Sequence, residues 1–387
     1  MINSRINKIK IVCTLPDLSG GGAERVMSIL MMYLDSSKYE IHLVIGKFIG
    51  VNSKGIPNYI KIHELGNLRS KQIVIPLIKI IKKINPDYII ATLGFVNPVI
   101  IGKVFFSKKT KIIIRYGNTL GSFLSEIRSK SIIRYYFYYF LTYLVNHFSD
   151  IIISQCEFMK NDLIRTFNLN SHNIKKIVTI YNPVDLGKIM HLSLNNSLSK
   201  IDYDAKKGPF LISVGRLEWQ KGFDYLINAI KKVKCAFPNV LLTIYGKGSK
   251  EVELKNLITK NDLEDNIKLM GFSSNPYFDL SKSDLFISSS RYEGFSNSII
   301  ESISLGVPVV ATDCPSGVRE IIVDGRNGWL STFKNVDREK TLSETIIKAL
   351  KSKDLLDKEE EKEKNNSKFG RNIFIKKVES LIQNATH

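Results

Sequence analysis

Short apolar segments alternate along the chain with longer segments in which apolar residues recur every three or four positions. The short segments are rich in Ile, Val and Leu and predict strands buried on both faces of a sheet, whereas the longer ones predict amphipathic helices. This alternation is typical of a parallel sheet covered by helices. The strands expected in the first half are Ile9–Thr14, Ile41–Ile45, Tyr88–Thr92, Lys111–Tyr116, Ile151–Ser154 and Ile177–Ile180, and the clearest helices are Ala23–Leu34 and Lys71–Ile84.

A polar stretch rich in Ser, Asn and Lys, residues 186–207, interrupts the alternation and predicts a linker. We therefore expect an α/β protein with two Rossmann-like domains, residues 1–185 and 208–365, which suits a chain of 387 residues. The strands expected in the second half are Phe210–Val214, Leu241–Tyr245, Ile267–Met270, Leu285–Ser288, Val309–Ala311 and Gly328–Leu330, with helices at Phe223–Val233 and Asn297–Leu305.

The C-terminal tail has two parts. Lys351–Lys368 is dense in Lys and Glu and predicts a solvated helix or loop. Arg371–Ile382 is amphipathic again. We expect residues 366–387 to form a helix that packs back toward the N-terminal domain.

The net charge of +19 is unevenly distributed. Residues 1–205 carry 27 Lys and Arg against 13 Asp and Glu, and residues 206–387 carry 29 against 24. A basic half attracts anionic partners such as nucleic acid, acidic lipid or a lipid diphosphate, although solvated surface lysines explain the charge equally well. Because no nucleic-acid motif is present and the charges do not form one stripe, we expect no nucleic acid as a partner.

Four scattered cysteines, Cys13, Cys156, Cys235 and Cys314, have neither metal-site nor disulfide-framework spacing and indicate a reduced, cytoplasmic compartment. We recognise no signal peptide at the N-terminus. The uncharged run Tyr135–Asn146 has twelve residues, which is shorter than the roughly 20 that a membrane span needs.

Two cations flank a turn early in the second half. Val214 ends an expected strand, Gly215 permits a tight turn, and Arg216 and Lys221 precede the next helix. Two cations beside free helix N–H groups suit a diphosphate. A surface loop with two ordinary charges is an equally good interpretation.

Two glutamates follow another expected strand. Glu293 lies in the loop before the helix that begins at Asn297, and Glu301 lies about one turn into that helix. At this spacing the two acids can line one elongated ligand, because carboxylates accept hydrogen bonds from sugar hydroxyls. Gly294 lets backbone N–H groups approach closely. Since the helix is otherwise small and apolar, its acid needs a partner.

A run of three glycines, Gly20–Gly22, follows the first expected strand and opens a helix, where backbone N–H groups can meet an anionic ligand. The run is not a dinucleotide fingerprint, because Arg25 stands where the third glycine should be. It also lacks the Gly-Lys-Ser/Thr of a phosphate-binding Walker loop.

In this order the segments resemble the family-four retaining glycosyltransferases, of the type that builds bacterial surface polysaccharides and lipid-linked glycans. The likeness is strong over residues 208–330 and moderate over the first 35, and between about 50 and 200 the alternating pattern carries it. The matching stretches are Gly21-Gly22-Ala23-Glu24-Arg25, Gly215-Arg216 with Lys221-Gly222, Tyr245-Gly246-Lys247-Gly248, and Glu293-Gly294-Phe295 with Glu301 and Gly306-x-Pro308.

The resemblance implies the GT-B fold, with a nucleotide-sugar donor bound in an interdomain cleft. It implies that Arg216 and Lys221 hold the donor diphosphate, that Glu301 binds the ribose, and that Glu293 binds the transferred sugar. It also implies that no metal or other cofactor is needed, because two cations and a helix N-terminus can stabilise the leaving diphosphate. Further residues expected at the donor site are Gly21, Gly22, Gly246, Gly248, Phe272, Gly294, Phe295, Ser296 and Asn297.

One position departs from the family pattern. Many members carry a His after a strand of the first domain, facing the reacting sugar, where this chain reads Arg115-Tyr116-Gly117-Asn118-Thr119. We expect Asn118 to supply a polar contact beside Glu293 in catalysis, but an amide cannot act as a general base. The leaving phosphate is then the expected acceptor of the proton.

The N-terminal half is the acceptor side in this architecture. Its positive charge and the aromatic run Tyr135–Tyr143 suit a membrane interface, although a place in the core explains the run equally well. We therefore expect a polyprenyl-diphosphate-linked glycan as acceptor and peripheral binding to the anionic inner face of the cytoplasmic membrane. Two alternatives remain open: another GT-B enzyme, such as a nucleotide-sugar epimerase or a phosphorylase, and a basic nucleic-acid-binding protein.

Overall fold

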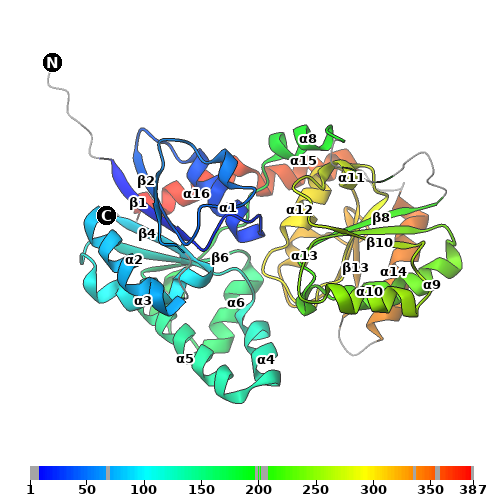
Figure 1. The fold of residues 1–387 in the computed structure, drawn as a ribbon, viewed down its shortest axis with the longest axis horizontal. Coiled ribbons are helices and arrows are strands. Elements are labelled where there is room, and N and C mark those ends of the chain that lie inside the picture. The colour runs from blue at the N-terminus through cyan, green and yellow to red at the C-terminus, as the bar shows by residue number, and fades with distance from the viewer. Residues whose placement is uncertain are drawn as a thin grey trace. The chain divides into compact units, whose positions relative to one another are not determined.

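A computed structural model of the chain describes residues 8–66, 70–196, 199, 201, 208–333, 337–353 and 358–384. Contacts divide the chain into two compact units: Met1–Pro183 together with Phe374–His387, and Val184–Ile373. Each unit contains one parallel sheet flanked by helices (Figure 1). The α/β class with two Rossmann-like parallel sheets is therefore confirmed.

The N-terminal unit contains a seven-stranded sheet in the order β3-β2-β1-β4-β5-β6-β7. The order reverses between β1 and β4, and open parallel sheets commonly bind ligands at the carboxyl ends of the strands beside such a reversal. The strands are β1 (Ile9–Leu15), β2 (Tyr39–Ile45), β3 (Lys61–Glu64), β4 (Tyr88–Thr92), β5 (Lys111–Arg115), β6 (Ile151–Ser154) and β7 (Ile177–Thr179).

Side chains of this sheet alternate between two cores. Ile11 and Cys13 of β1 face the core that contains α1, whereas Val12 between them faces the core that contains α2 and α3. The α-helices of the N-terminal unit are α1 (Gly22–Tyr33), α2 (Ser70–Ile84), α3 (Val96–Gly102), α4 (Leu120–Lys130), α5 (Ile132–Phe148), α6 (Glu157–Phe167) and α7 (Ser171–Lys175), and the 3-10 turns are η1 (Ser53–Gly55), η2 (Leu93–Phe95) and η3 (Lys103–Phe105).

The C-terminal helix α16 (Arg371–Asn384) contributes to the core of the N-terminal unit. Its apolar face, which includes Phe374, Val378 and Ile382, is buried among residues of β1, β2 and α1. The hydroxyl of Tyr88 also donates to the carbonyl of Ile382 at 2.8 Å. The last part of the chain therefore closes the unit with which the chain begins.

The C-terminal unit contains a six-stranded sheet in the order β10-β9-β8-β11-β12-β13, which reverses between β8 and β11. Its strands are β8 (Phe210–Val214), β9 (Leu241–Tyr245), β10 (Ile267–Gly271), β11 (Leu285–Ser288), β12 (Val309–Thr312) and β13 (Gly328–Ser331). Its helices are α8 (Leu186–Ser193), the 3-10 turn η4 (Trp219–Lys221), α9 (Phe223–Ala236), α10 (Glu251–Lys260), α11 (Tyr277–Ser281), α12 (Asn297–Ser304), α13 (Val318–Ile321), α14 (Arg338–Ser352) and α15 (Lys358–Phe369).

Two segments differ from their expected character. The stretch 186–207 begins with the helix α8, which packs beside α11, and Asn275 donates to the carbonyl of Leu192 at 2.9 Å. Most of the remainder lies outside the described residues. The Lys- and Glu-rich tail forms the helix α15, which agrees with a helix, but it is not wholly solvated, because Asn365 donates to the carbonyl of Ile300 of α12 at 3.1 Å. Among the described residues, no helix is long and apolar enough to cross a bilayer.

Two histidines lie against each other on β2 and β3, at the edge of the N-terminal sheet. The rings of His42 and His63 stack with centroids 5.2 Å apart, and their nitrogens Nδ1 and Nε2 are 2.9 Å apart. Burial lowers the pKa of both imidazoles, although the carboxylate of Glu40 offsets part of this effect at His42. Protonation of both rings is therefore less favourable in the folded state than in the unfolded chain.

This pair predicts a loss of stability in acid. Because the folded-state pKa values lie below the ordinary value of about 6.5, the unfolded chain binds more protons, and stability falls as the pH drops below that value. We expect the melting temperature to fall less between about pH 7 and pH 5 in the double variant His42→Gln/His63→Gln, whose amides keep a hydrogen bond but do not titrate. Equal slopes in wild type and variant would contradict the prediction.

Candidate active site

The residues singled out from the second half of the sequence meet at the carboxyl edge of the C-terminal sheet. Arg216 and Lys221 follow β8, and Glu293 follows β11. These strands are neighbours and lie where the strand order reverses. Since ligands of open parallel sheets bind at this kind of position, the topology itself identifies a candidate site.

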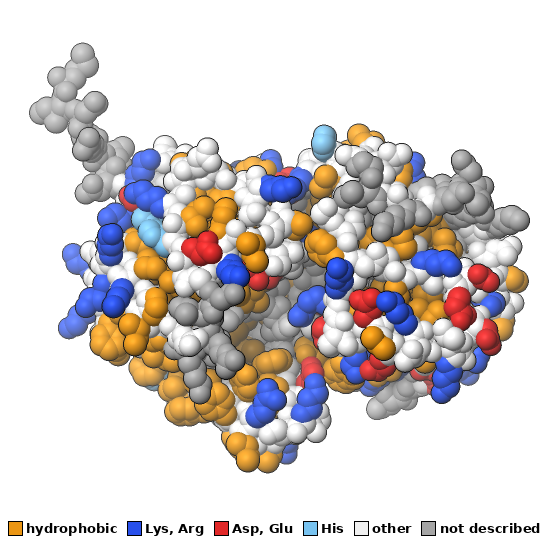
Figure 2. All heavy atoms as spheres, in the orientation of Figure 1, with side chains coloured by type: hydrophobic (Ala, Val, Ile, Leu, Met, Phe, Trp, Pro, Cys, Tyr) orange, Lys and Arg blue, Asp and Glu red, His pale blue; other side chains and the backbone are white. Residues whose placement is uncertain are grey.

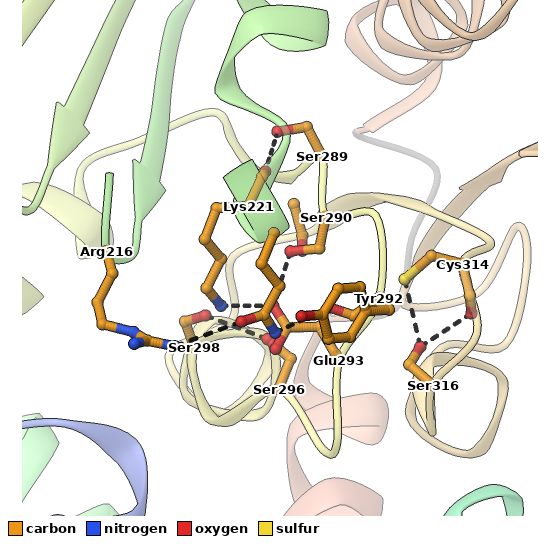
Figure 3. A network of polar contacts seen from close by, with 12 residues as sticks. Arg216, Lys221, Ser289, Ser290, Tyr292, Glu293, Ser296, Ser298, Cys314 and Ser316 are labelled. Atoms are coloured by element: carbon orange, nitrogen blue, oxygen red, sulfur yellow. Dashed lines mark hydrogen bonds and ion pairs between the residues drawn. The ribbon is translucent and has the colours of Figure 1, made fainter. Parts of the chain in front are cut away.

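Lys221 and Glu293 form an ion pair at the centre of this site. Their side chains are only 18% and 10% exposed. The hydroxyl of Ser290 also donates to the same carboxylate oxygen at 2.7 Å, and the hydroxyl of Ser289 donates to the carbonyl of Lys221 at 2.9 Å. Figure 3 shows the ammonium and carboxylate groups pointing toward each other from separate loops.

Arg216 is held beside this pair through Gln220. The guanidinium donates to the side-chain oxygen of Gln220 at 3.3 Å, and the amide nitrogen of Gln220 donates to the carbonyl of Tyr292 at 2.9 Å. Gln220 therefore connects the loop after β8 with the loop after β11. This role of Gln220 was not predicted from the sequence, although the residue lies between Arg216 and Lys221.

Backbone hydrogen bonds fix the loop around Gly294. The N–H of Glu293 donates to the carbonyl of Pro315 at 3.2 Å, and the N–H of Gly317 donates to the carbonyl of Gly294 at 3.1 Å. Cys314 precedes Pro315 in the loop after β12. Burial raises the pKa of its thiol to about 12, so this cysteine is an inert packing residue. The loop after β12 thus supports the loop that carries Glu293.

The helix α12 begins directly after this loop. Ser296 is its N-cap and makes no side-chain capping bond, and Asn297 is its first residue. Glu301 lies one turn further on and is only 8% exposed. The ring of Phe295 packs edge-on against Phe369 at 5.3 Å, so the side chain of this expected ligand-binding residue belongs to the core.

Gly246 and Gly248 lie against the backbone of the loop that carries Arg216. A Cβ on Gly246, which has φ +153°, would lie 1.8 Å from the carbonyl oxygen of Gly215. A Cβ on Gly248 would lie 2.3 Å from the carbonyl oxygen of Leu217. Both glycines are therefore required for this close backbone approach. Phe272, which follows β10, leaves about half of its side chain exposed.

A stack of one cationic and two aromatic side chains begins at Arg291, two residues before Glu293. The guanidinium of Arg291 lies between the rings of Trp219 and Tyr225, 4.5 and 3.9 Å from their centroids. It also donates two hydrogen bonds to the carboxylate of Asp224, at 2.8 and 2.6 Å. Burial opposes the charge on Arg291, but the hydrogen bonds and charge of Asp224 outweigh that effect and raise its pKa.

The first-half residues lie at the carboxyl edge of the N-terminal sheet. Gly21 and Gly22 follow β1 and begin α1, and a Cβ on Gly21 would lie 2.3 Å from the carboxylate of Glu24. Asn118 follows β5. Arg115, at the end of β5, is buried and donates to Asn182 at 2.5 Å, and burial lowers its pKa to about 10. Its burial was not apparent from the sequence.

The described residues contain no group of three or more His, Cys, Asp or Glu side chains placed to hold a metal ion.

Two family descriptions together match most of the chain. Residues 198–370 match "Glycosyl transferases group 1", and residues 20–188 match "Glycosyltransferase Family 4". A solved structure of HepE from Anabaena in complex with UDP and glucose has the same fold, with a TM-score of 0.75 and 18% identity over 97% of this chain and 100% of that one. The class of fold is therefore GT-B.

Two relatives are similar in sequence. An N-acetylgalactosamine-N,N'-diacetylbacillosaminyl-diphospho-undecaprenol 4-alpha-N-acetylgalactosaminyltransferase from Campylobacter jejuni is 31% identical over 332 residues, which cover 82% of this chain and 84% of the relative. An uncharacterised glycosyltransferase from Methanocaldococcus jannaschii is 34% identical over 254 residues, which cover 64% of this chain and 60% of the relative. The chain belongs to the glycosyltransferases.

The Arg291 stack predicts an unequal response of two arginines to the same substitution. Arg291→Lys keeps the charge but loses the planar stack and the bidentate pairing, so we expect a loss of about 2 kcal/mol and a melting temperature roughly 4–8 °C lower. Arg319→Lys is the matched control, because Arg319 pairs bidentately with Asp313 but is 71% exposed. Its effect should stay within about 0.5 kcal/mol. Equal effects in thermal melts would contradict a structural role for the stack.

Proposed function

We propose that this enzyme is a retaining glycosyltransferase that moves a hexose or N-acetylhexosamine from a UDP-sugar to a lipid-linked saccharide in surface polysaccharide biosynthesis. The observation that carries the proposal is the cluster of Arg216, Lys221 and Glu293 at the carboxyl edge of the C-terminal sheet. The acceptor named for the Campylobacter relative and the UDP bound to HepE support the substrate classes.

Each part of the donor has a proposed partner in the C-terminal unit. Arg216 and Lys221 bind the diphosphate, because two fixed cations stabilise the negative charge that develops as it leaves. Glu301 accepts hydrogen bonds from the ribose, and Glu293 accepts them from the transferred sugar. The backbone N–H groups of Gly294–Asn297 contact that sugar, next to the uncapped start of α12. No metal or other cofactor takes part in this proposal.

The proposed reaction breaks the bond between the anomeric carbon and the β-phosphate oxygen, and the electron pair stays on that oxygen. The acceptor hydroxyl forms the new glycosidic bond on the same face of the sugar, and its proton passes to the departing phosphate. Asn118 supplies a polar contact to the sugar in place of a histidine, and the Gly21–Gly22 backbone binds an anionic part of the substrate.

The proposed acceptor is a glycan linked to a polyprenyl diphosphate. The excess of basic residues in positions 1–205, 27 Lys and Arg against 13 Asp and Glu, favours an anionic membrane surface. We accordingly place the enzyme on the inner face of the cytoplasmic membrane as a peripheral protein.

A screen of nucleotide sugars, measured by release of UDP or GDP and by thermal-shift binding, tests the proposal. Glu301→Ala should weaken donor binding by about tenfold or more, because the ribose loses a charged hydrogen-bond acceptor. Glu293→Ala should reduce kcat more strongly than donor affinity, since its contact is with the reacting sugar.

The matched control is Glu264→Ala, which removes an exposed acid elsewhere in the same unit. It should leave both quantities unchanged. A failure of every nucleotide sugar to bind would refute the proposed function, and release of an epimerised donor would replace it with epimerase activity.

Asn118→Ala tests the first-domain contribution. We expect kcat to fall by roughly ten- to a hundredfold, because the sugar loses one positioned hydrogen bond, while the affinity for UDP stays unchanged. Steady-state kinetics with the donor found in the screen measure both effects. An unaltered kcat would remove Asn118 from the mechanism.

A further inference from the structure

The helix α5 has two faces of different environment. Tyr135, Tyr138 and Tyr139 pack against the core formed by α4, α6 and β6. On the opposite face, Phe137 and Phe140 are 57% and 58% exposed. The aromatic run is therefore a core element on one side and an exposed apolar surface on the other.

The exposed surface continues beyond α5 to the end of α3. Val104 of η3 is 81% exposed and Phe105 is 55% exposed. The ammonium of Lys103 donates to the carbonyl of Phe148 at 2.6 Å and joins η3 to the last turn of α5. We call this surface the α5–η3 face, and it comprises Ile101, Val104, Phe105, Ile133, Tyr136, Phe137, Phe140, Tyr143 and Phe148.

Figure 2 shows hydrophobic side chains gathered over α3 and α5, at the lower left of the view. Contiguous apolar surface of this kind is uncommon on soluble proteins and marks a binding surface. Tyrosine and phenylalanine, the residues that dominate this face, are enriched where apolar and aqueous environments meet.

Basic residues border the α5–η3 face at both ends. Arg128, Lys130 and Arg134 are exposed near the start of α5, and Lys108 and Lys109 are exposed after η3. Residues 96–150 contain eight Lys and Arg against two acids, Glu126 and Asp150. Both acids are paired, Glu126 with Lys130 at 2.5 Å and Asp150 with Lys103 at 3.1 Å. The apolar surface is thus flanked by positive charge at both ends.

We propose that the α5–η3 face docks the enzyme on an anionic lipid bilayer. An apolar face with aromatic residues and a basic border lies in the interface plane of such a bilayer, because the apolar side chains enter the headgroup region and the cations remain among the lipid phosphates. The seventeen residues of α5 lie along the surface, since they are too few and too firmly packed on the core to span it.

Charge favours a bilayer over a second copy of this chain as the occupant. A symmetric dimer through this face would bring the same basic border against itself. Like charges placed together across an interface cost several kcal/mol. An anionic membrane instead presents the opposite charge to this border.

This inference rests on the proposed function, because docking on a bilayer brings the enzyme to its acceptor only if that acceptor is lipid-linked. Its test does not require turnover. A chain that binds nucleotide sugar but no vesicles refutes only the docking surface, whereas a chain that binds vesicles but no nucleotide sugar refutes only the proposed function.

Flotation of the full chain with vesicles of phosphatidylcholine, with and without phosphatidylglycerol, tests the proposal. At low salt we expect wild type to float with the anionic vesicles and to be released by added salt. Phe137→Ser/Phe140→Ser should lower the partition coefficient at least about tenfold, because two aromatic side chains no longer enter the interface.

The control Val252→Ser/Val323→Ser removes two exposed apolar side chains from the C-terminal unit, where they are 70% and 50% exposed. It should bind vesicles like wild type. Thermal melts and UDP binding should be the same for both double variants and wild type, which shows that any loss of flotation is not a loss of fold.

Three results would overturn the proposal. Wild type could fail to bind anionic vesicles at low salt, or the Phe137/Phe140 variant could bind as tightly as wild type. Light scattering could also show a wild-type dimer that this variant converts to a monomer, which would make the face a subunit interface.

Discussion

The ion pair between Lys221 and Glu293 is the interaction on which the architecture of the candidate site depends. Its two charges are largely removed from water, so each must stay beside the other or be compensated. The partners come from different loops, one after β8 and the other after β11, and are 72 residues apart in sequence. The hydrogen bonds from Ser289 to the carbonyl of Lys221 and from Gln220 to the carbonyl of Tyr292 join the same two loops.

Close backbone packing allows the loop after β8 and the loop after β11 to approach each other. Gly222 has φ +62°, and a Cβ there would lie 2.1 Å from the carbonyl oxygen of Ser289. Any other residue would push the loop after β8 away from the loop after β11 and separate the charges. The hydrogen bonds of Gln220 and the stacking of Arg291 also hold the two loops together, so the loops form one preorganised surface.

The sequence predicted most of the fold because buried parallel strands are continuous apolar runs. The edge strand β3 was not predicted, since Lys61, His63 and Glu64 interrupt any such run, and Lys61, Ile62 and Glu64 are exposed. The helix α8 was read as linker because its segment is short and polar on one side. Such elements depend on tertiary neighbours more than on their own pattern.

The candidate site was predictable only in part. Its members follow strands, and the loops that follow parallel strands meet at one edge, which the sequence makes visible. Contacts between loops far apart in sequence depend on strand order, so the pairing of Arg291 with Asp224 had no sequence signal. The environment of the aromatic run Tyr135–Tyr143 was also not predictable, because its composition does not indicate which face of the helix the neighbouring helices cover.

The position of α16 has a consequence for the order in which the molecule is made. Phe374, Val378 and Ile382 complete a core that otherwise consists of residues from the first half of the chain. During synthesis the ribosome must produce the whole of the C-terminal unit before these residues emerge. The unit translated second can therefore fold first, whereas the unit translated first keeps an apolar face uncovered, and accessible to chaperones, until α16 has been synthesised.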